Sequence, residues 1–492
     1  VPRDVPPVLP ANPVPAPTGA SGTVTGLPAL LSAGGFATFS PAFAQLGIRT
    51  AGDESGRLGS GNGGVSRSAA ELSTGPYQLQ RADGQSRSFR TLSAAVAEAR
   101  SGDVILLRYN GYPDDLPAQP AVRLVGTNLI VRAAEGFRPT LQFDVIPDDA
   151  TTPAQLFSLR SQSSLTIRDV DLRMIVRADQ AAERWSLFQL AGANRVLLEN
   201  VSIECETPAG QAAVLFDLTD ETQLPGEVAR DESEIVLNRV ICRAHADAFR
   251  IACQPRGRIR LQDSALALSG RLIDLRGDYS MQPSRGALEV LTDHLTCLHE
   301  GALIRMADTE QRQTGSVQRL LPRLSIRSEA SVYAAAGPET PLLQFNGSGY
   351  VDDIESLVSW NGFTSLYHGH IVFWQIESSA LDFASRRLDF SQWKQLWQNR
   401  ADGEDTSAEV IRDNAWRELS WKTETGLDLA GINPAAFELN GQLFFPGLGA
   451  LPLARDGEIP GVNPQELPAF PRRRMPEPQA EPAEEAEPPA TP

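Results

Sequence analysis

A short alternating pattern recurs between Phe157 and Phe345, and it restricts the possible folds more than any other feature of this sequence. Each occurrence has two apolar residues with a single residue between them, which is the period of a β-strand that buries one face. The first series is Leu165-Thr166-Ile167, Val196-Leu197-Leu198, Ile235-Val236-Leu237, Ile259-Arg260-Leu261, Leu288-Glu289-Val290 and Leu324-Ser325-Ile326. A second series precedes it: Phe157-Ser158-Leu159, Phe188-Gln189-Leu190, Phe216-Asp217-Leu218, Phe249-Arg250-Ile251, Ile273-Asp274-Leu275, Ile304-Arg305-Met306 and Leu343-Gln344-Phe345. A third series follows polar corners such as Arg168-Asp169, Glu199-Asn200 and Gln262-Asp263, and it comprises Val170-Asp171-Leu172, Val201-Ser202-Ile203, Val240-Ile241-Cys242 and Ser264-Ala265-Leu266.

Three short strands in a constant order describe one coil of a parallel β-solenoid. Equivalent positions lie 31, 24 and 36 residues apart in the intervals Ile167–Leu198, Leu237–Leu261 and Val290–Ile326. A leucine-rich or armadillo array keeps a tighter period, whereas a solenoid tolerates insertions between its strands. A β-sandwich also buries alternating residues, but the recurring three-strand order makes it the weaker alternative.

The composition divides the chain into four parts. We expect a Pro/Gly-rich linker over residues 1–75, mostly disordered, and a parallel β-helix over 76–385. A C-terminal cap is predicted over 386–455, and a Pro/Glu-rich disordered tail over 456–492.

The two ends of the predicted solenoid carry helical patterns. Apolar residues at helical spacing over 92–99 predict a short N-terminal capping helix, because an open solenoid end would expose its core. Six of the seven tryptophans lie beyond residue 355. Ser391 is the expected N-cap of a helix with Trp393 and Trp397 on one face, which would close the other end.

Charge and hydrophobicity exclude several kinds of partner. The formal net charge of −17 argues against nucleic acid. No apolar run approaches the roughly 18–20 residues of a membrane helix, so we expect no membrane insertion by this segment. Because the chain begins with Val1 and shows no signal peptide, we expect it to be a processed or excised portion of a longer protein.

The cysteines do not suggest a metal site. The four cysteines stand singly, without the close pairs that zinc sites use. Buried free thiols are the expected state, and a bridge between Cys205 and Cys242 is the alternative. The sequence predicts no cofactor and no metal.

The coil pattern and its opening resemble a known superfamily. Phe89-Arg90-Thr91-Leu92 and Ser101-Gly102-Asp103, followed by a strand, are similar to right-handed parallel β-helix proteins of the pectate-lyase-like superfamily. The segment 357–362 and Tyr367, followed by the Trp393/Trp397 helix, resemble extracytoplasmic β-helix regions of planctomycete bacteria, some attached to serine/threonine kinases. The resemblance implies a right-handed β-helix in the periplasm or at the cell surface, tethered through the N-terminal linker.

Two groups of residues are candidate sites. Asp217, Arg250, Asp274 and Arg305 occupy the outward position in successive coils, where neighbours lie about 4.8 Å apart. We expect them to neutralise one another, whereas a calcium-dependent lyase would use such carboxylates to hold the ion and an arginine as the base. The second group, Trp360 and Tyr367, could stack on sugars or belong to the core.

Enzymatic motifs are weak. His368-Gly369-His370 inverts the Gly-His-Gly of polygalacturonase-like enzymes, and Arg258-Ile259-Arg260 only echoes their Arg-Ile-Lys. We therefore predict a non-enzymatic β-helix that acts as a binding, sensing or structural surface module of a membrane-linked bacterial protein, with polysaccharide or another envelope protein as partner. A polysaccharide lyase or glycoside hydrolase, with calcium only in the lyase, is the first alternative. A self-assembling cell-surface fibre subunit is the second.

Overall fold

The computed structural model describes residues 75–471 with internal gaps, and these lie in the second of two compact units, Arg67–Pro492. The gaps of four residues or more are 220–231, 278–285, 380–384, 399–408, 412–415, 418–421 and 441–452, and the other gaps are of one or two residues. The predicted linker before Gly75 and the predicted tail beyond Pro471 lie outside the described residues.

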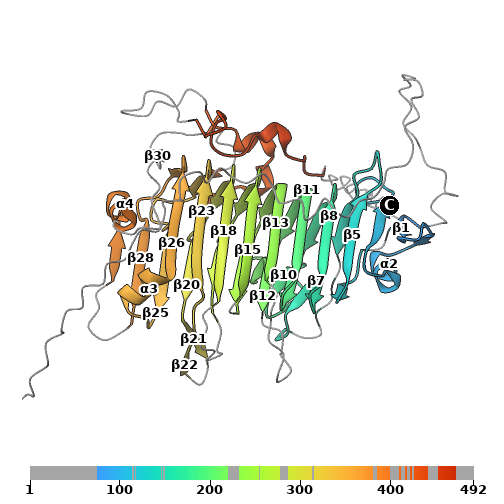
Figure 1. The fold of residues 1–492 in the computed structure, drawn as a ribbon, viewed down its shortest axis with the longest axis horizontal. Coiled ribbons are helices and arrows are strands. Elements are labelled where there is room, and N and C mark those ends of the chain that lie inside the picture. Colours follow the sequence, from blue (N-terminus) through green and yellow to red (C-terminus); the bar gives the residue numbers. More distant parts are fainter. Residues whose placement is uncertain are drawn as a thin grey trace, which may run out of the picture. The chain divides into compact units, whose positions relative to one another are not determined.

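Two long sheets run along a stack of coils, as Figure 1 shows. The described strands of the ten-stranded sheet are β4 (Val122–Val125), β7 (Ala154–Arg160), β10 (Trp185–Ala191), β12 (Ala213–Thr219), β14 (Asp247–Ala252), β17 (Ile273–Leu275), β20 (Ile304–Ala307), β25 (Leu343–Gly347), β28 (Trp374–Ser378) and β29 (Arg386–Leu388). Those of the eighteen-stranded sheet are β1 (Tyr77–Gln80), β2 (Ser86–Phe89), β3 (Asp103–Leu107), β5 (Asn128–Ala133), β6 (Thr140–Phe143), β8 (Ser164–Arg168), β9 (Asp171–Ile175), β11 (Arg195–Glu206), β13 (Ser233–Ala244), β15 (Arg256–Gln262), β16 (Ala265–Leu268), β18 (Ala287–Asp293), β19 (Thr296–His299), β23 (Arg323–Glu329), β24 (Val332–Ala335), β26 (Val358–Phe363), β27 (Leu366–His368) and β30 (Glu409–Ile411). Pairing from coil to coil is parallel, for example between β10, β12 and β14, so the prediction of an all-β parallel solenoid is confirmed.

In seven successive coils, from β8 and β9 to β26 and β27, a left-handed corner residue divides the eighteen-stranded sheet into two halves. The corner residues have φ between 46° and 58°, and they are Asp169, Asn200, Arg239, Asp263, His294, Ala330 and Thr364. Asp and Asn tolerate this conformation best among residues with a side chain. The bend sends the chain from the first strand series of the sequence into the third, and the predicted corners at Asp169, Asn200 and Asp263 are confirmed.

The inward side chains stack in rows. Ile167, Leu198, Leu237 and Leu261 follow one another in register and are buried. Val290 and Ile326 are also buried, but they belong to the adjacent row, because Val290 pairs with Ile259. The first row continues instead with Thr292 and Ser328. Their hydroxyls both bond to the Tyr333 hydroxyl, at 2.7 and 2.9 Å, so the polar groups in this part of the core are satisfied.

The ten-stranded sheet contributes an aromatic ladder. Phe157, Phe188, Phe216 and Phe249 stack with ring centroids 4.9 to 5.0 Å apart. This spacing follows from the distance between parallel strands in register. The row of rings fills the interior beside the inward aliphatic rows.

Secondary structure covers both ends of the described solenoid. At one end, α2 (Leu92–Glu98) buries Leu92 and Ala95, and the Thr91 side chain caps it by accepting from Ala94 N–H. At the other end, α4 (Phe390–Gln398) buries Trp393 and Trp397. With α3 (Val351–Leu357), these described helices are seven to nine residues long, and none in the described part of the chain could cross a membrane.

The cap of α4 differs from the prediction. The Asp389 carboxylate accepts the N–H of Gln392 at 2.9 Å, and the Gln392 side chain accepts the N–H of Asp389 at 3.1 Å. This reciprocal pair is a capping box. The N-cap is therefore Asp389 and not Ser391, because α4 already begins at Phe390.

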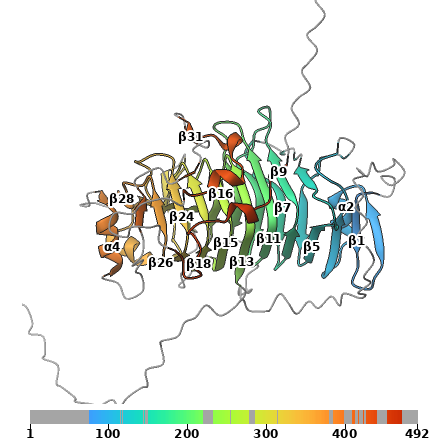
Figure 2. The same cartoon turned by 90° about the horizontal axis from the view of Figure 1, so that it is seen from above.

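The region after α4 lies along the side of the solenoid. We call residues 427–440 and 453–471 the lateral strap; it is red in Figures 1 and 2 and crosses the outer face of the eighteen-stranded sheet. Its buried apolar residues are Leu429, Ile432, Ala436, Phe437, Leu439, Val462 and Leu467. They cover an outward apolar strip made of Ile241, Ala265, Ala267, Leu298, Val332, Ala334 and Leu366.

The strap changes the predicted division of the C-terminal region. Of the described residues in the predicted cap, 386–398 covers the end and β30 pairs with β27, whereas 427–440 lies against the side. Val462 and Leu467, placed by the prediction in a disordered tail, are buried against the apolar strip. The tail prediction is therefore wrong for 456–471. Sequence composition missed it because the strap has no periodic pattern of its own.

Deleting residues 427–492 should expose the apolar strip. Contiguous apolar patches promote association, so we expect higher binding of an apolar dye and larger particles in light scattering than for the full chain. The matched control deletes residues 472–492 and leaves the strap in place. Equal dye binding and particle size for the two deletions would contradict the covering role of the strap.

Candidate functional site: an arginine-lined pocket

The four charged residues predicted to stack share one row on the outer face of the ten-stranded sheet. Asp217 pairs in register with Arg250, Arg250 with Asp274, and Asp274 with Arg305. The row continues with neutral polar residues, which are Ser158 and Gln189 on one side and Gln344 and Gln375 on the other. The predicted register is therefore confirmed.

Asp217 is fully buried although it occupies an outward position. Its Oδ1 accepts from Arg250 Nη1 at 2.8 Å, and its Oδ2 accepts from Arg184 Nε at 3.0 Å. Arg184 directly precedes β10 and comes from the preceding coil. The carboxylate thus has both oxygens in ion pairs and holds two guanidinium groups in place.

Asp274 is also buried, but its ion pair differs from the prediction. Its Oδ2 accepts from Arg276 Nε at 2.7 Å, two residues along the same chain segment. Its Oδ1 has no hydrogen-bond partner among the described residues. Burial lowers the pKa of Arg305, and the charge of Asp274 partly offsets that effect. Asp217 and Arg250 therefore form an ion pair within the row, whereas Asp274 pairs with Arg276, which lies outside the row.

A pocket of about 410 Å³ opens beside this row. Four arginines line it, Arg184, Arg250, Arg271 and Arg276. The acidic residues that line it are Glu183, Asp247 and Asp274. We call this site the arginine pocket.

Asp247 fixes the edge of the arginine pocket. Its Oδ1 accepts from the backbone N–H of Arg271 at 2.7 Å, and both its oxygens lie 3.4 Å from Arg271 Nη1. Gly270 permits this approach, since a Cβ there would lie 2.3 Å from the same Oδ1. Burial raises the pKa of Asp247, the charge of Arg271 lowers it, and the charge of Asp274 raises it again.

The arrangement favours binding of an anion. A guanidinium has five N–H donors, and the described ion pairs of Arg250 and Arg276 use Nη1 and Nε respectively. The remaining donors are pre-oriented by buried carboxylates, which lowers the entropy lost when a ligand binds.

The same contacts are poorly suited to acid–base catalysis. Inverting hydrolysis requires two carboxyls about 6.5–9.5 Å apart with a water between them. Asp217 has both oxygens in ion pairs, and Asp247 already accepts a backbone N–H. Burial raises the pKa of Asp247, however, and a raised pKa is the property that a general acid needs.

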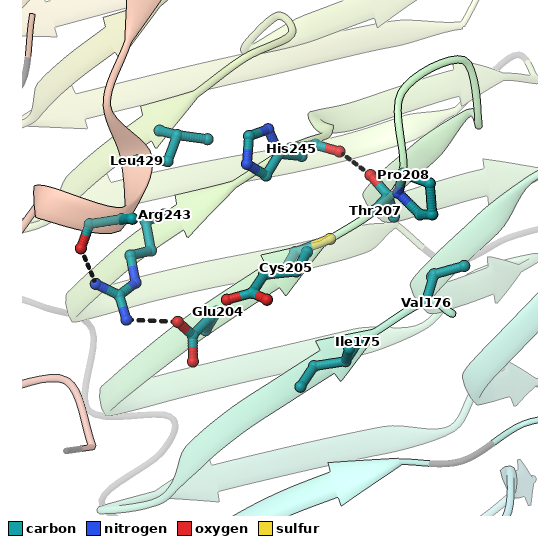
Figure 3. Close-up of a pocket in the computed structure, with 11 residues that line it drawn as sticks. Ile175, Val176, Glu204, Cys205, Thr207, Pro208, Arg243, His245 and Leu429 are labelled. Carbon is teal, nitrogen blue, oxygen red and sulfur yellow. Dashed lines mark hydrogen bonds and ion pairs between the residues drawn. The ribbon is translucent and has the colours of Figure 1, made fainter. Parts of the chain in front are cut away.

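A second pocket, of about 370 Å³, also has His245 in its lining (Figure 3). It is built between β11, β13 and the strap turn η2 (Leu429–Gly431). Arg243 crosses it, pairs with the buried Glu204 and donates from Nη1 to the carbonyls of Ala430 and Ile432 at 3.1 Å each. Its guanidinium also lies 4.3 Å from the Phe470 ring. Arg243 therefore anchors the strap, and its charge is already compensated.

The aromatic candidates lie in the core. Trp360 and Tyr367 are both fully buried, and each packs against Trp393 of α4 with ring centroids 5.7 and 5.6 Å apart. The hypothesis that they stack on sugars is wrong, because the capping helix covers them. The core alternative, which the sequence left open, is the correct one.

The remaining candidates from the sequence, His370 and the cysteines Cys205 and Cys242, are also buried. His370 packs against His299, with ring centroids 5.1 Å apart. In the residues that the structure describes, no three or more His, Cys, Asp or Glu side chains are grouped to hold a metal. Cys205 and Cys242 are free thiols, and burial raises the pKa of both.

Sequence reasoning missed Arg184, Asp247, Arg271 and Arg276. Arg276 shares the outward parity of Asp274 and could have been found by extending the strand by two residues. Arg184 and Arg271 lie in the turns that precede β10 and β17, outside the alternating pattern. Only the coil-to-coil stacking brings them beside the row.

Together, the fold and the site define a parallel β-solenoid with a lateral, arginine-lined pocket. Comparison of the chain with family models, with curated proteins and with solved structures found no match.

Proposed function

We propose that this protein is a non-catalytic binding module whose arginine pocket takes an anionic group of a polysaccharide. The observation that carries the proposal is the set of guanidinium groups held by buried carboxylates, with Arg250 on Asp217 and Arg276 on Asp274. Charge-assisted hydrogen bonds from a fixed arginine fork are the strong and geometrically specific contacts to carboxylate, sulfate or phosphate.

The setting of this module is part of the proposal. The resemblance to planctomycete β-helix regions favours an extracytoplasmic location, tethered through the Pro/Gly-rich segment before Tyr77, and a sensor role beside a serine/threonine kinase. Membership of the pectate-lyase-like superfamily is likewise a proposal, supported by the parallel coils and their corners. Another envelope protein is the alternative partner. A fibre subunit is disfavoured because α2 and α4 occupy the ends of the described solenoid.

Replacing Arg276 with lysine or alanine should weaken binding of an acidic oligosaccharide. Loss of a charge-assisted bidentate contact is expected to lower affinity by about ten- to hundredfold. Calorimetry with oligogalacturonate and oligo-alginate, against a neutral oligosaccharide of equal length, measures this. Thermal unfolding checks that each variant folds, and lysine keeps a cation beside Asp274.

Arg123→Ala is the matched control. Arg123 is exposed in the same outward row, two coils before Gln189, and does not line the pocket. Equal losses for Arg123→Ala and the Arg276 variants would indicate non-specific attraction. Absence of binding by the unchanged protein to every acidic glycan tested would overturn the proposal.

A lyase or hydrolase is the second candidate, because Asp247 has a raised pKa and shares the pocket with Asp274. We expect no turnover of the same glycans with or without calcium. Turnover that is lost in Asp247→Asn or Arg250→Ala would replace the binding proposal with the enzymatic one.

A further inference from the structure

The lateral strap meets the solenoid at a histidine corner. His294 has φ of 47° and occupies the corner between β18 and β19. Its Nδ1 lies 2.9 Å from Asp293 Oδ1, and its Nε2 lies 3.4 Å from Asp456 Oδ2 of the strap. One imidazole therefore lies between a carboxylate of the solenoid and a carboxylate of the strap.

The surroundings of this imidazole are predominantly acidic. Asp263 occupies the corner of the preceding coil, and Glu329 directly precedes the corner of the next coil. Arg455 of the strap has its Nε 3.9 Å from Glu329 Oε1, and its Cζ lies 3.8 Å from the centroid of the Phe363 ring. Glu466 of the strap adds a further negative charge near Asp263. The positive charges that compensate this cluster are Arg455 and, when it is protonated, His294. The negative charges are those of Asp263, Asp293, Glu329, Asp456 and Glu466.

The next strap residues fit closely beside this corner. Gly461 N–H donates to the Ala330 carbonyl at 2.6 Å, and Val462 N–H donates to Thr296 Oγ1 at 3.0 Å. Gly461 has φ of +93°, and a Cβ there would lie 2.8 Å from Thr296 Oγ1 and 2.9 Å from Val332 Cγ2. Small changes in the distance between strap and solenoid would therefore break these contacts.

We propose that His294 is a pH-sensitive latch, which holds the strap on the solenoid while its imidazole is protonated and loosens the strap when the proton is lost. The imidazole lies between Asp293 and Asp456, with one ring nitrogen toward each, so loss of a proton leaves the two carboxylates with less positive charge to compensate them. The remaining cation, Arg455, is directed to Glu329 and Phe363. Loosening uncovers the part of the apolar strip near Val332. The inference is independent of the anion-binding proposal.

The direction of the pH effect follows from the charges at the corner. Burial alone lowers the pKa of His294, but the hydrogen bond to Asp293 and the charges of Asp293, Asp456 and Asp263 raise it above its usual value overall. Asp293 and Asp263 belong to the solenoid and act on the imidazole in both states, so docking of the strap raises the pKa of His294 through the charge of Asp456. A group whose pKa is raised on docking stabilises the docked state fully below its undocked pKa, and this stabilisation is lost as pH rises through the docked value. The strap is therefore held most firmly in mildly acidic conditions and less firmly above neutrality.

Hydrogen exchange on the full chain at pH 6 and pH 8, corrected for intrinsic exchange rates, measures the latch. We expect protection of peptides covering 454–467 to fall by about two- to fivefold between these values, the range for a partly exposed ion pair. His294→Gln, which keeps a hydrogen-bonding side chain without a titrating proton, should abolish the difference. Asp456→Asn should reduce it as well.

Two controls separate the latch from general loosening. His245→Gln removes an exposed imidazole and should leave the pH response intact. Gly461→Ala should lower protection at both pH values while keeping their ratio, because it disturbs the fit and not the charges. Equal protection of 454–467 at pH 6 and pH 8, or an unchanged response in His294→Gln, would overturn the proposal.

Discussion

Replacing Phe216 with alanine is expected to lower the free energy of unfolding by about 3–5 kcal/mol, as measured by urea denaturation. Phe216 has no exposed surface, and its ring stacks between those of Phe188 and Phe249 at 4.9 and 5.0 Å. Its removal leaves a cavity that the two neighbouring rings cannot close, because each is held by its own strand in register. The loss should therefore be near the top of the range for a core aromatic.

Phe216→Leu and Tyr350→Ala are the matched comparisons. Leucine restores part of the volume and should recover part of the loss, as Ile273 already fills the equivalent position in the coil after Phe249. Tyr350 is 57% exposed, so its truncation should change stability by no more than about 0.5 kcal/mol. A loss below about 1 kcal/mol for Phe216→Ala would show that the ladder is not a packed part of the core.

The body of the solenoid is predictable because its determinants are local. In Leu165-Thr166-Ile167 the alternation alone assigns two side chains to the core, and Asp169 marks the corner because aspartate tolerates left-handed φ. Once each coil is placed, stacking in register follows, and this is why Asp217, Arg250 and Asp274 were expected in one row. The sequence pattern aligned Val290 with Leu261, one row away from its position in the structure. The residues that continue the row of Leu261 are Thr292 and Ser328, whose polar side chains are accommodated in the core because their hydroxyls bond to Tyr333.

The parts that could not be predicted depend on contacts between distant segments. Arg243 donates a hydrogen bond to the carbonyl of Ala430, which is 187 residues away in the sequence. The strap has no periodic pattern from which that contact could be predicted. Asp217 looked exposed because its position is outward, yet Arg184 and Arg250 cover it. Trp360 could have belonged to a surface or to the core until the position of α4 was known. Burial set by a neighbouring coil or by a returning strap cannot be read from the alternation within one strand.

Acidification from pH 7 to pH 4 is expected to remove about 3 kcal/mol of stability through His299 alone. His299 is fully buried, its Nδ1 lies 2.6 Å from the Gly301 carbonyl, and its ring packs on that of His370. Burial lowers the pKa of His299 from 6.5 to about 4, and the Gly301 carbonyl offsets only part of that effect. Burial also lowers the pKa of His370, and the neighbouring His299 lowers it further.

The sign follows from proton binding in the two states. Between about pH 6.5 and pH 4 the unfolded chain carries a proton on His299 and the folded chain does not. Stability from this group is therefore complete above pH 6.5 and is lost progressively as pH falls toward 4. The pKa of His370 is also lowered by burial, so it contributes to the same fall, and the contribution of His299 must be separated by substitution.

His299→Leu provides that separation. Leu268 occupies the register-equivalent position in the preceding coil, so leucine fits the row and removes the titrating group. Denaturation at pH 7, 5.5 and 4.5 should show a shallower fall for His299→Leu than for the unchanged protein, whereas His245→Gln at an exposed site should show the same fall as the unchanged protein. An equal pH slope in His299→Leu, or an imidazole that titrates near pH 6.5 by NMR, would mean that His299 is hydrated in solution and that the core around His370 is more open than the packing of the two rings indicates.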